Sequence, residues 1–107
     1  MEVKLINYLN KDVADYDDFA LDGEIYIGPE NEDYAYEVFE FHVISVKRLY
    51  LNFEDNGIML NRGWMISKIY DEDLIMAKIE SIVSKFKKTN DEECYNELGA
   101  YFIRVTL

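Results

Sequence analysis

The first half of the chain carries short alternations of apolar and polar residues. Residues 2–9 alternate loosely, with Val3 and Leu5 on one face and Ile6 on the other, which predicts a strand. Residues 10–20 are polar and acidic, and we interpret them as a connection. A short helical turn fits within this connection, because three apolar or aromatic residues recur there at a spacing of three: Val13, Tyr16 and Phe19.

Three further segments have strand character. Residues 24–27 predict a second strand, which Gly28 and Pro29 end. Residues 34–46 give the clearest strand, since they are rich in aromatic and β-branched residues. Residues 64–70 predict a fourth strand. In the 34–46 segment we expect three side chains on one face, Phe39, Phe41 and Val43, and two on the other, Glu40 and His42.

Helical signals dominate the rest of the chain. A turn-like helix is expected at 47–53, and Asp55-Asn56-Gly57 predicts a turn. Asp71 is a good N-cap for a helix over 72–88, with a stripe formed by Ile75, Ile79, Ile82, Val83 and Phe86 and a cationic last turn formed by Lys85, Lys87 and Lys88. Thr89-Asn90-Asp91-Glu92 resembles a capping box for a shorter helix that ends near Leu98 and Gly99. Residues 101–107 alternate and predict a final strand.

The expected order is therefore β-β-β-β-α-α-β. It predicts an α+β fold: a mainly antiparallel sheet of about five strands with two helices of the C-terminal half packed on one face. With 107 residues, we expect one domain spanning 1–107. No apolar run is long enough for a transmembrane helix, and the first residues do not resemble a signal peptide. Together with a single cysteine, Cys94, these features favour a cytoplasmic protein.

Charge is distributed very unevenly. The whole chain has a net charge of −11, and its first 40 residues hold 12 acids against two bases, a net of −10. An anionic surface repels nucleic acid and anionic lipid and attracts cationic partners. We therefore expect neither a nucleic-acid partner nor a membrane partner.

No pattern of catalytic or metal-binding residues is present. One histidine and one cysteine, 52 positions apart, cannot form a zinc site, and the acids near Asp17 do not have the spacing of a calcium loop. His42 is best interpreted as a strand histidine, and Cys94 as a small buried residue. The five glycines form no phosphate-binding loop. We expect no metal, no cofactor and no enzymatic activity.

The remaining candidate site is an acidic and aromatic binding surface. Tyrosines are interleaved with the acids of the first 40 residues, and tyrosine is a favoured interface anchor. A solvated acidic face with ordinary strand tyrosines is the plainer alternative. The residues expected to bind a partner are seven acids that would steer association and three aromatic anchors: Asp12, Asp15, Asp17, Asp18, Glu30, Glu32 and Asp33, with Tyr16, Tyr34 and Tyr36.

Several segments, in order, resemble the Immunity protein 8 family over roughly residues 22–105. They are Ile27-Gly28-Pro29; the strand and turn marked by Phe39, Phe41, Val43, Ser45 and Leu49; Met65-Ile66 and Tyr70-Asp71 with the helix carrying Ile75, Ile79 and Val83; and Glu93, Leu98 and Tyr101-Phe102. Val46 and Arg48 depart from the family pattern, which tends to have proline and tryptophan there. Each segment is weak alone, and the order and spacing carry the resemblance.

The resemblance implies a small bacterial protein that protects its cell from a polymorphic toxin, including toxins of contact-dependent growth inhibition. Such a protein would bind the toxic C-terminal domain of a cognate effector, and charge favours a basic target such as a nuclease. An acidic adaptor or regulatory module with a non-toxin partner shares these sequence features. An enzyme would need a pocket with a perturbed carboxylate pair, which acids near Tyr26 or His42 could supply.

Overall fold

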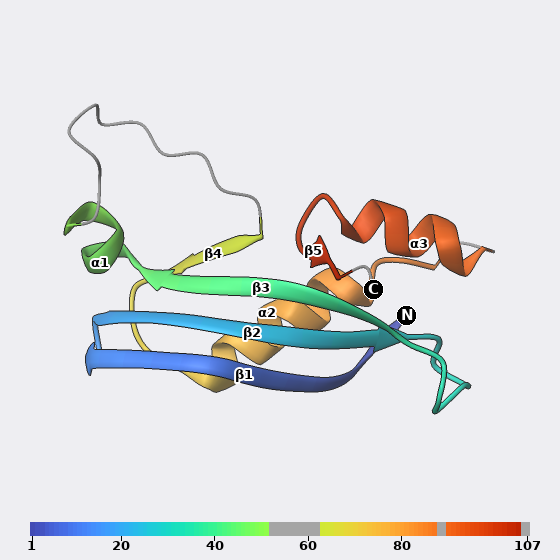
Figure 1. Cartoon of the computed structure of the whole chain (residues 1–107), viewed down its shortest axis with the longest axis horizontal. Coiled ribbons are helices and arrows are strands. Elements are labelled where there is room, and N and C mark those ends of the chain that lie inside the picture. The colour runs from blue at the N-terminus through green and yellow to red at the C-terminus, as the bar shows by residue number, and fades with distance from the viewer. Residues whose placement is uncertain (52–62, 88–89, 106–107) are drawn as a thin grey trace.

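In a computed structural model, the chain folds as an α+β protein, and the structure describes residues 1–51, 63–87 and 90–105. A five-stranded sheet contains β1 (Glu2–Asp15), β2 (Asp18–Gly28), β3 (Glu37–Ser45), β4 (Trp64–Ser67) and β5 (Ile103–Arg104). Three helices accompany it: α1 (Val46–Leu51), α2 (Glu72–Val83) and α3 (Asp91–Leu98). Figure 1 shows α2 behind the strands, so that one face of the sheet is turned toward the viewer.

The core lies between the sheet and the two later helices. Alternate residues of β2 and β3 point to the same side, and they pack against the apolar stripe of α2 and the buried residues of α3. Its fully buried members include Phe19, Leu21, Ile25 and Ile27 of β2, Phe39, Phe41 and Val43 of β3, and Ile79 and Leu98 of the helices. The expected fold class and the expected inward face of β3 are confirmed.

The first two strands are longer than predicted. Residues 10–20, which we expected to connect two strands, continue β1 to Asp15 and begin β2 at Asp18, so they form the end of a long antiparallel hairpin. The expected helical turn there is wrong. The spacing of Val13, Tyr16 and Phe19 misled because Phe19 is buried whereas Val13 and Tyr16 are exposed.

The predicted faces of β1 are also wrong. The register shifts between Val3 and Leu5, which marks a β-bulge, and the alternation changes phase there. As a result Val3 and Ile6 both pack against the core, whereas Leu5 is exposed on the opposite face. A bulge of this kind leaves no clear trace in the sequence pattern.

The order of elements differs from the prediction at α1. This helix stands between β3 and β4, and β4 pairs with β3 in parallel, while the other pairings are antiparallel. The buried hydroxyl of Ser45 accepts the N–H of Arg48 at 3.1 Å, which caps the start of α1. The expected turn-like helix is thus confirmed over Val46–Leu51, while Phe53 and Asp55-Asn56-Gly57 lie outside the described residues.

The other predicted elements are shorter in the structure. β3 begins only at Glu37, β4 ends at Ser67 and β5 holds two residues. α2 ends at Val83, because the N–H groups of Lys85 and Phe86 turn back to the carbonyls three residues before them. Lys85 and Lys87 therefore follow the helix rather than forming its last turn. Lys88, Thr89, Thr106 and Leu107 lie outside the described residues.

The predicted N-terminal ends of α2 and α3 are confirmed, but the capping residue of α3 differs from the prediction. The carboxylate of Asp71 accepts the N–H groups of Asp73 and Leu74 at 3.0 and 3.2 Å, as expected of an N-cap. The cap of α3 is Asn90, whose side chain accepts the N–H of Glu92 at 2.8 Å, rather than a threonine-led box. Cys94 is buried in α3, as predicted.

Candidate functional site

One face of the sheet is left uncovered by α2 and α3, and we call it the open face. The strand register places alternate residues there: Leu5, Asn7, Asn10 and Asp12 of β1, Asp22, Glu24 and Tyr26 of β2, Val38, Glu40 and His42 of β3, and Trp64 and Ile66 of β4. Exposed apolar side chains occur on this face, since Leu5 and Ile66 are 54% and 59% exposed. An exposed sheet face that mixes apolar, aromatic and acidic residues is a candidate interaction surface.

Two acidic residues occupy opposed positions near the middle of the open face. Glu24 of β2 stands directly opposite Glu40 of β3 in the register of the two strands. Like charges in directly opposed positions destabilise a sheet. Among the described residues, neither carboxylate has a hydrogen bond or a cation within salt-bridge distance. In the part of the chain that the structure describes, the open face therefore presents two unpartnered negative charges at opposed positions.

Aromatic pairs flank these two carboxylates along the strands. Two residues after Glu24, the ring of Tyr26 lies 5.2 Å from that of Tyr36. Two residues after Glu40, the ring of His42 stacks on Trp64 with the ring centres 4.9 Å apart. Aromatic faces attract Lys and Arg side chains, and Tyr and Trp are enriched among the residues that dominate binding energy. The arrangement is therefore suited to receiving a cationic side chain.

A neighbouring hollow extends the open face beyond Tyr36. It has a volume of about 430 Å³ and is lined by Glu24, Tyr36, Glu37, Val38 and Val105. On the other side of the carboxylate pair, Asp22 contacts Nδ1 of His42 at 2.5 Å and fixes the orientation of the imidazole. The central part of the face thus combines an acidic pair, two aromatic pairs and a recess.

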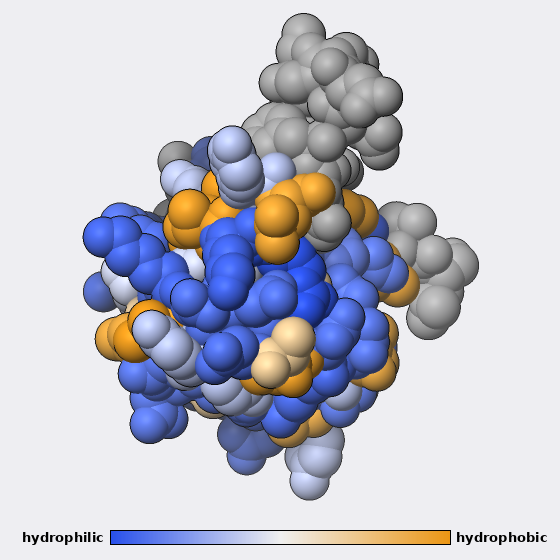
Figure 2. Space-filling model, turned by 90° about the vertical axis from the view of Figure 1, so that its left-hand side faces the viewer, coloured by the Kyte–Doolittle hydropathy of each residue, from blue (hydrophilic) through white to orange (hydrophobic). Residues whose placement is uncertain are grey.

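The hairpin end of the sheet holds five of the predicted site residues: Asp12, Asp15, Tyr16, Asp17 and Asp18. Figure 2 looks onto this end and shows a mostly hydrophilic surface interrupted by small apolar patches. Arg48 of α1 binds both Asp12 and Asp18 at 2.7 Å, and Lys47 lies 3.6 Å from Asp17. The hydrogen bond that Arg48 donates to the Asp18 carboxylate is the largest factor that raises the pKa of Arg48. Much of the acidity of this end is therefore offset within the molecule.

The other five predicted residues lie at the opposite end of the sheet, between β2 and β3. They are Glu30, Glu32, Asp33, Tyr34 and Tyr36, and all of them are exposed. Since β2 has 11 residues, the two ends are separated by roughly 35 Å. The structure does not bring the ten predicted residues together. Two of them border the open face: Tyr36, through its contact with Tyr26, and Asp12, through its register.

Sequence reasoning did not predict the residues between these two ends as a binding surface, and it considered acids near Tyr26 or His42 only for the enzyme alternative. Asp22, Glu24 and Tyr26 alternate with buried residues of β2, as a half-buried strand requires. That alternation was available as a signal, but the prediction began the strand at residue 24. The pairing of Glu24 with Glu40 joins residues 16 positions apart and depends on a register that the sequence does not show.

Comparison with known proteins decides what kind of molecule carries this surface. A family model described as Immunity protein 8 matches residues 1–103 of the chain. The chain belongs to the Immunity protein 8 family. No curated protein and no solved structure matches it.

Membership makes this chain an immunity protein, and the family implies a cognate toxin as its partner and suggests an inhibitory role. The segments that carried the resemblance have structural roles in the immunity protein. Gly28 lies so close to the β2–β3 connection that a Cβ there would stand 1.9 Å from the carbonyl oxygen of Ala35, and Ser45 caps α1. These segments support the fold, and they do not identify which face binds a partner.

Two further observations bear on the immunity protein's chemistry. Within residues 1–51, 63–87 and 90–105, no three His, Cys, Asp or Glu side chains converge to hold a metal ion. Among the helices that the structure describes, none combines the length and apolar character needed to cross a membrane.

Proposed function

We propose that this immunity protein binds the toxic C-terminal domain of its cognate effector and blocks it without catalysis. The observation that carries the proposal is the family match over residues 1–103. Blocking needs a surface that fits the toxin and excludes its substrate, and it needs no reacting group on the inhibitor. We further propose that it acts in the cytoplasm, where the thiol of Cys94 stays reduced.

The open face is the surface that we propose for the contact. Glu24 and Glu40 would receive an Arg or Lys side chain of the toxin, and the Tyr26–Tyr36 and His42–Trp64 pairs would pack around it. Such a cation would also relieve the repulsion between the two carboxylates. Binding would therefore form two charge-assisted contacts and at the same time remove a repulsion that is present in the free protein.

A basic toxin surface is the partner that this face favours. Toxins that cut nucleic acid are basic where their substrate binds, because the phosphate backbone dominates that affinity. An acidic inhibitor on such a site would compete with the substrate for the same cations. A nuclease is accordingly the target activity that we propose.

The ten residues predicted from the sequence take a second role in this proposal. The acids at both ends of the sheet would steer the toxin toward the open face and accelerate association. Tyr16 and Tyr34, which are 64% and 96% exposed, would add contacts at the two ends if the toxin domain extends that far. Tyr36 would act directly, as part of the central aromatic pair.

Growth rescue tests the proposed function. The C-terminal domain of the large protein encoded just upstream would be expressed with and without this chain, and survivors would be counted. We expect restored growth, together with a complex of the two purified proteins. Continued killing by the toxin domain in the presence of soluble immunity protein would contradict the assigned pairing. Complex formation without rescue would favour an adaptor role instead.

A further inference from the structure

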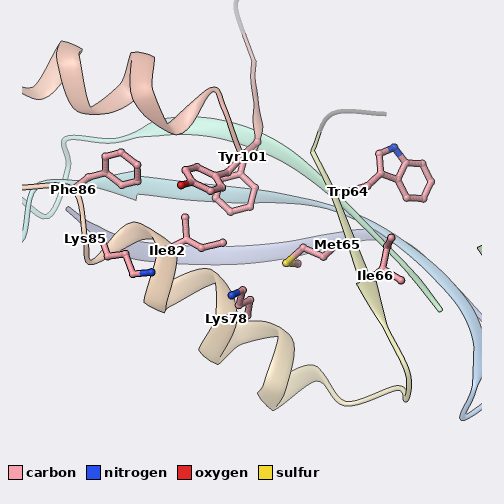
Figure 3. A pocket seen from close by; sticks show the side chains of 9 residues that line it. Trp64, Met65, Ile66, Lys78, Ile82, Lys85, Phe86 and Tyr101 are labelled. Atoms are coloured by element: carbon pink, nitrogen blue, oxygen red, sulfur yellow. The ribbon is translucent and has the colours of Figure 1, made fainter. Parts of the chain in front are cut away.

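A groove separates β4 from α2 on the helix side of the sheet. It has a volume of about 410 Å³, and Figure 3 shows Met65 of β4 pointing into it and Ile82 on its α2 side. Phe86 and Tyr101 close one end. A smaller hollow of about 100 Å³ continues the groove toward the start of α2, where Leu74 is 57% exposed. An apolar channel therefore follows β4 along most of its length.

Two lysines of the helix side stand at the edge of this groove. Lys78 and Lys85 both line it, and both are exposed. Within the described part of the chain, neither ammonium group has a carboxylate partner. The two ammonium groups make the groove complementary to an anionic apolar ligand.

The free edge of β4 borders the same groove. The carbonyl of Gly63 accepts the N–H of His42 at 2.9 Å, so the backbone groups of Gly63 face β3. Because successive residues of a strand point their backbone groups to opposite sides, those of Trp64 and Ile66 point away from β3. Within the described ranges, β4 is the last strand on this side of β3 and no residue pairs with its outer edge. An unpaired edge of this kind is a template for another strand.

We propose that an extended segment of a partner protein adds as a strand to the outer edge of β4. It would place one apolar side chain in the groove, over Met65 and Ile82, and a carboxylate on each side of it, to pair with Lys78 and Lys85. Strand addition provides backbone hydrogen bonds, and the groove selects the alternate side chains. This site is separate from the open face and does not depend on the function proposed above.

The spacing of the two lysines fits such a segment. Lys78 lies on α2 and Lys85 in the turn that follows its end at Val83, and the five helical steps from Lys78 to Val83 alone rise by roughly 8 Å. Side chains at positions i and i+4 of an extended strand are separated by roughly 13 Å and point to the same side. The difference is within the reach of flexible lysine and glutamate side chains. The recognised pattern is therefore acid, any residue, apolar residue, any residue, acid.

A short synthetic peptide provides the test. The probe is acetyl-Asp-Val-Leu-Val-Glu-amide, and its control is the Asn and Gln analogue, which has the same shape without charge. Trp64, the single tryptophan of the chain, lies on β4, so a change in its fluorescence reports the addition of a segment along this strand. We expect saturable binding of the acidic probe, binding about tenfold weaker for the neutral analogue, and loss of binding when the peptide backbone is N-methylated.

Variants of the full chain decide whether the groove is responsible. The double variant Lys78→Glu with Lys85→Glu should bind the acidic probe at least about tenfold more weakly. The control is Lys68→Glu with Lys87→Glu, an equal charge change at exposed lysines outside the groove lining. It should bind the acidic probe as tightly as the unaltered chain. Thermal melting confirms that both double variants fold. Three results would each overturn the proposal. They are equal binding by both double variants, no fluorescence change on adding the probe, and sedimentation experiments in which a second copy of this chain occupies the edge.

Discussion

At the scale of single residues, a small cluster joins the sheet to the start of α2. The carboxylate of Glu72 accepts hydrogen bonds from the Tyr70 hydroxyl and from Lys11, the latter at 3.0 Å. Tyr8 lies close by, under the Lys11 ammonium, and burial is the main cause that raises its pKa to about 12. These contacts tie β1 to the helix side of the molecule and leave Tyr8 uncharged.

Glu72→Gln tests the charge of this cluster. The hydrogen bond from Tyr70, followed by that from Lys11, holds the pKa of Glu72 below its ordinary 4.5. A lowered folded-state pKa stabilises the protein above pH 4.5, and this stabilisation is lost as the pH falls through the lower value. We expect the variant to lose about 0.5 kcal/mol of unfolding free energy at pH 7, since the group is partly exposed. Urea unfolding should show that loss shrinking toward pH 3, and a constant difference at both pH values would contradict it.

At the scale of elements, the N-capped helices were predictable and the hairpin end was not. Asp71 and the stripe of Ile75, Ile79 and Val83 are local signals, and local signals specify a helix well. β1 is an edge strand whose second half is exposed, so its residues carry no apolar alternation that would mark a strand. The open face was missed for a related reason, because its central pair depends on contacts between strands.

Gly28→Ala tests the close approach in the β2–β3 connection. A new methyl group would meet the carbonyl oxygen of Ala35 at 1.9 Å, and backbone cannot move as a side chain can. We expect a loss of about 1–3 kcal/mol in unfolding free energy. Gly99→Ala is the comparison, since its methyl group meets one carbonyl at 3.0 Å. If the two variants were equally stable, the close approach at Gly28 would not be a constraint.

Arg48→Ala tests how α1 is held to the hairpin end. The guanidinium binds Asp12 and Asp18, and its side chain is 16% exposed. We expect a loss of about 1–2 kcal/mol, because a half-buried Asp18 would lose its charged donor. Lys47→Ala, which removes a longer and more exposed pair, should change stability by less than about 0.5 kcal/mol. Thermal melts of the two variants should separate clearly, and coincident melts would argue against the role of Arg48.

At the scale of the whole molecule, the acids of the sheet differ from one end to the other in whether a cation binds them. Three acids of the hairpin end, Asp12, Asp17 and Asp18, are bound by Arg48 or Lys47, whereas those of the central pair and of the β2–β3 connection have no such partner in the described structure. Within the sheet and its connections, the acids without a cation partner therefore lie mainly in the middle and at the far end. Reversing the hairpin acids would mix steering with the loss of Arg48 contacts.

Glu30→Lys with Glu32→Lys separates steering from structure. Both residues are exposed, and we expect association with the toxin domain to slow by about tenfold at low salt and by less at high salt. Glu80→Lys with Glu93→Lys makes the same change of charge on the helices and should have a smaller effect. Stopped-flow association rates measure the difference. Identical rates for the two double variants would mean that the β2–β3 connection does not face the toxin.

The paired stability and affinity of Glu24→Gln with Glu40→Gln test the central claim most directly. Removing two opposed charges should raise the unfolding free energy by about 0.2–1 kcal/mol, because the repulsion between them is lost. The same change should weaken toxin binding by about tenfold or more, because a cation would lose both of its partners. Glu80→Gln with Glu93→Gln, an equal charge change on the helix side, should leave binding close to that of the unaltered protein. A more stable variant that binds the toxin as tightly as before would contradict the assignment of the open face.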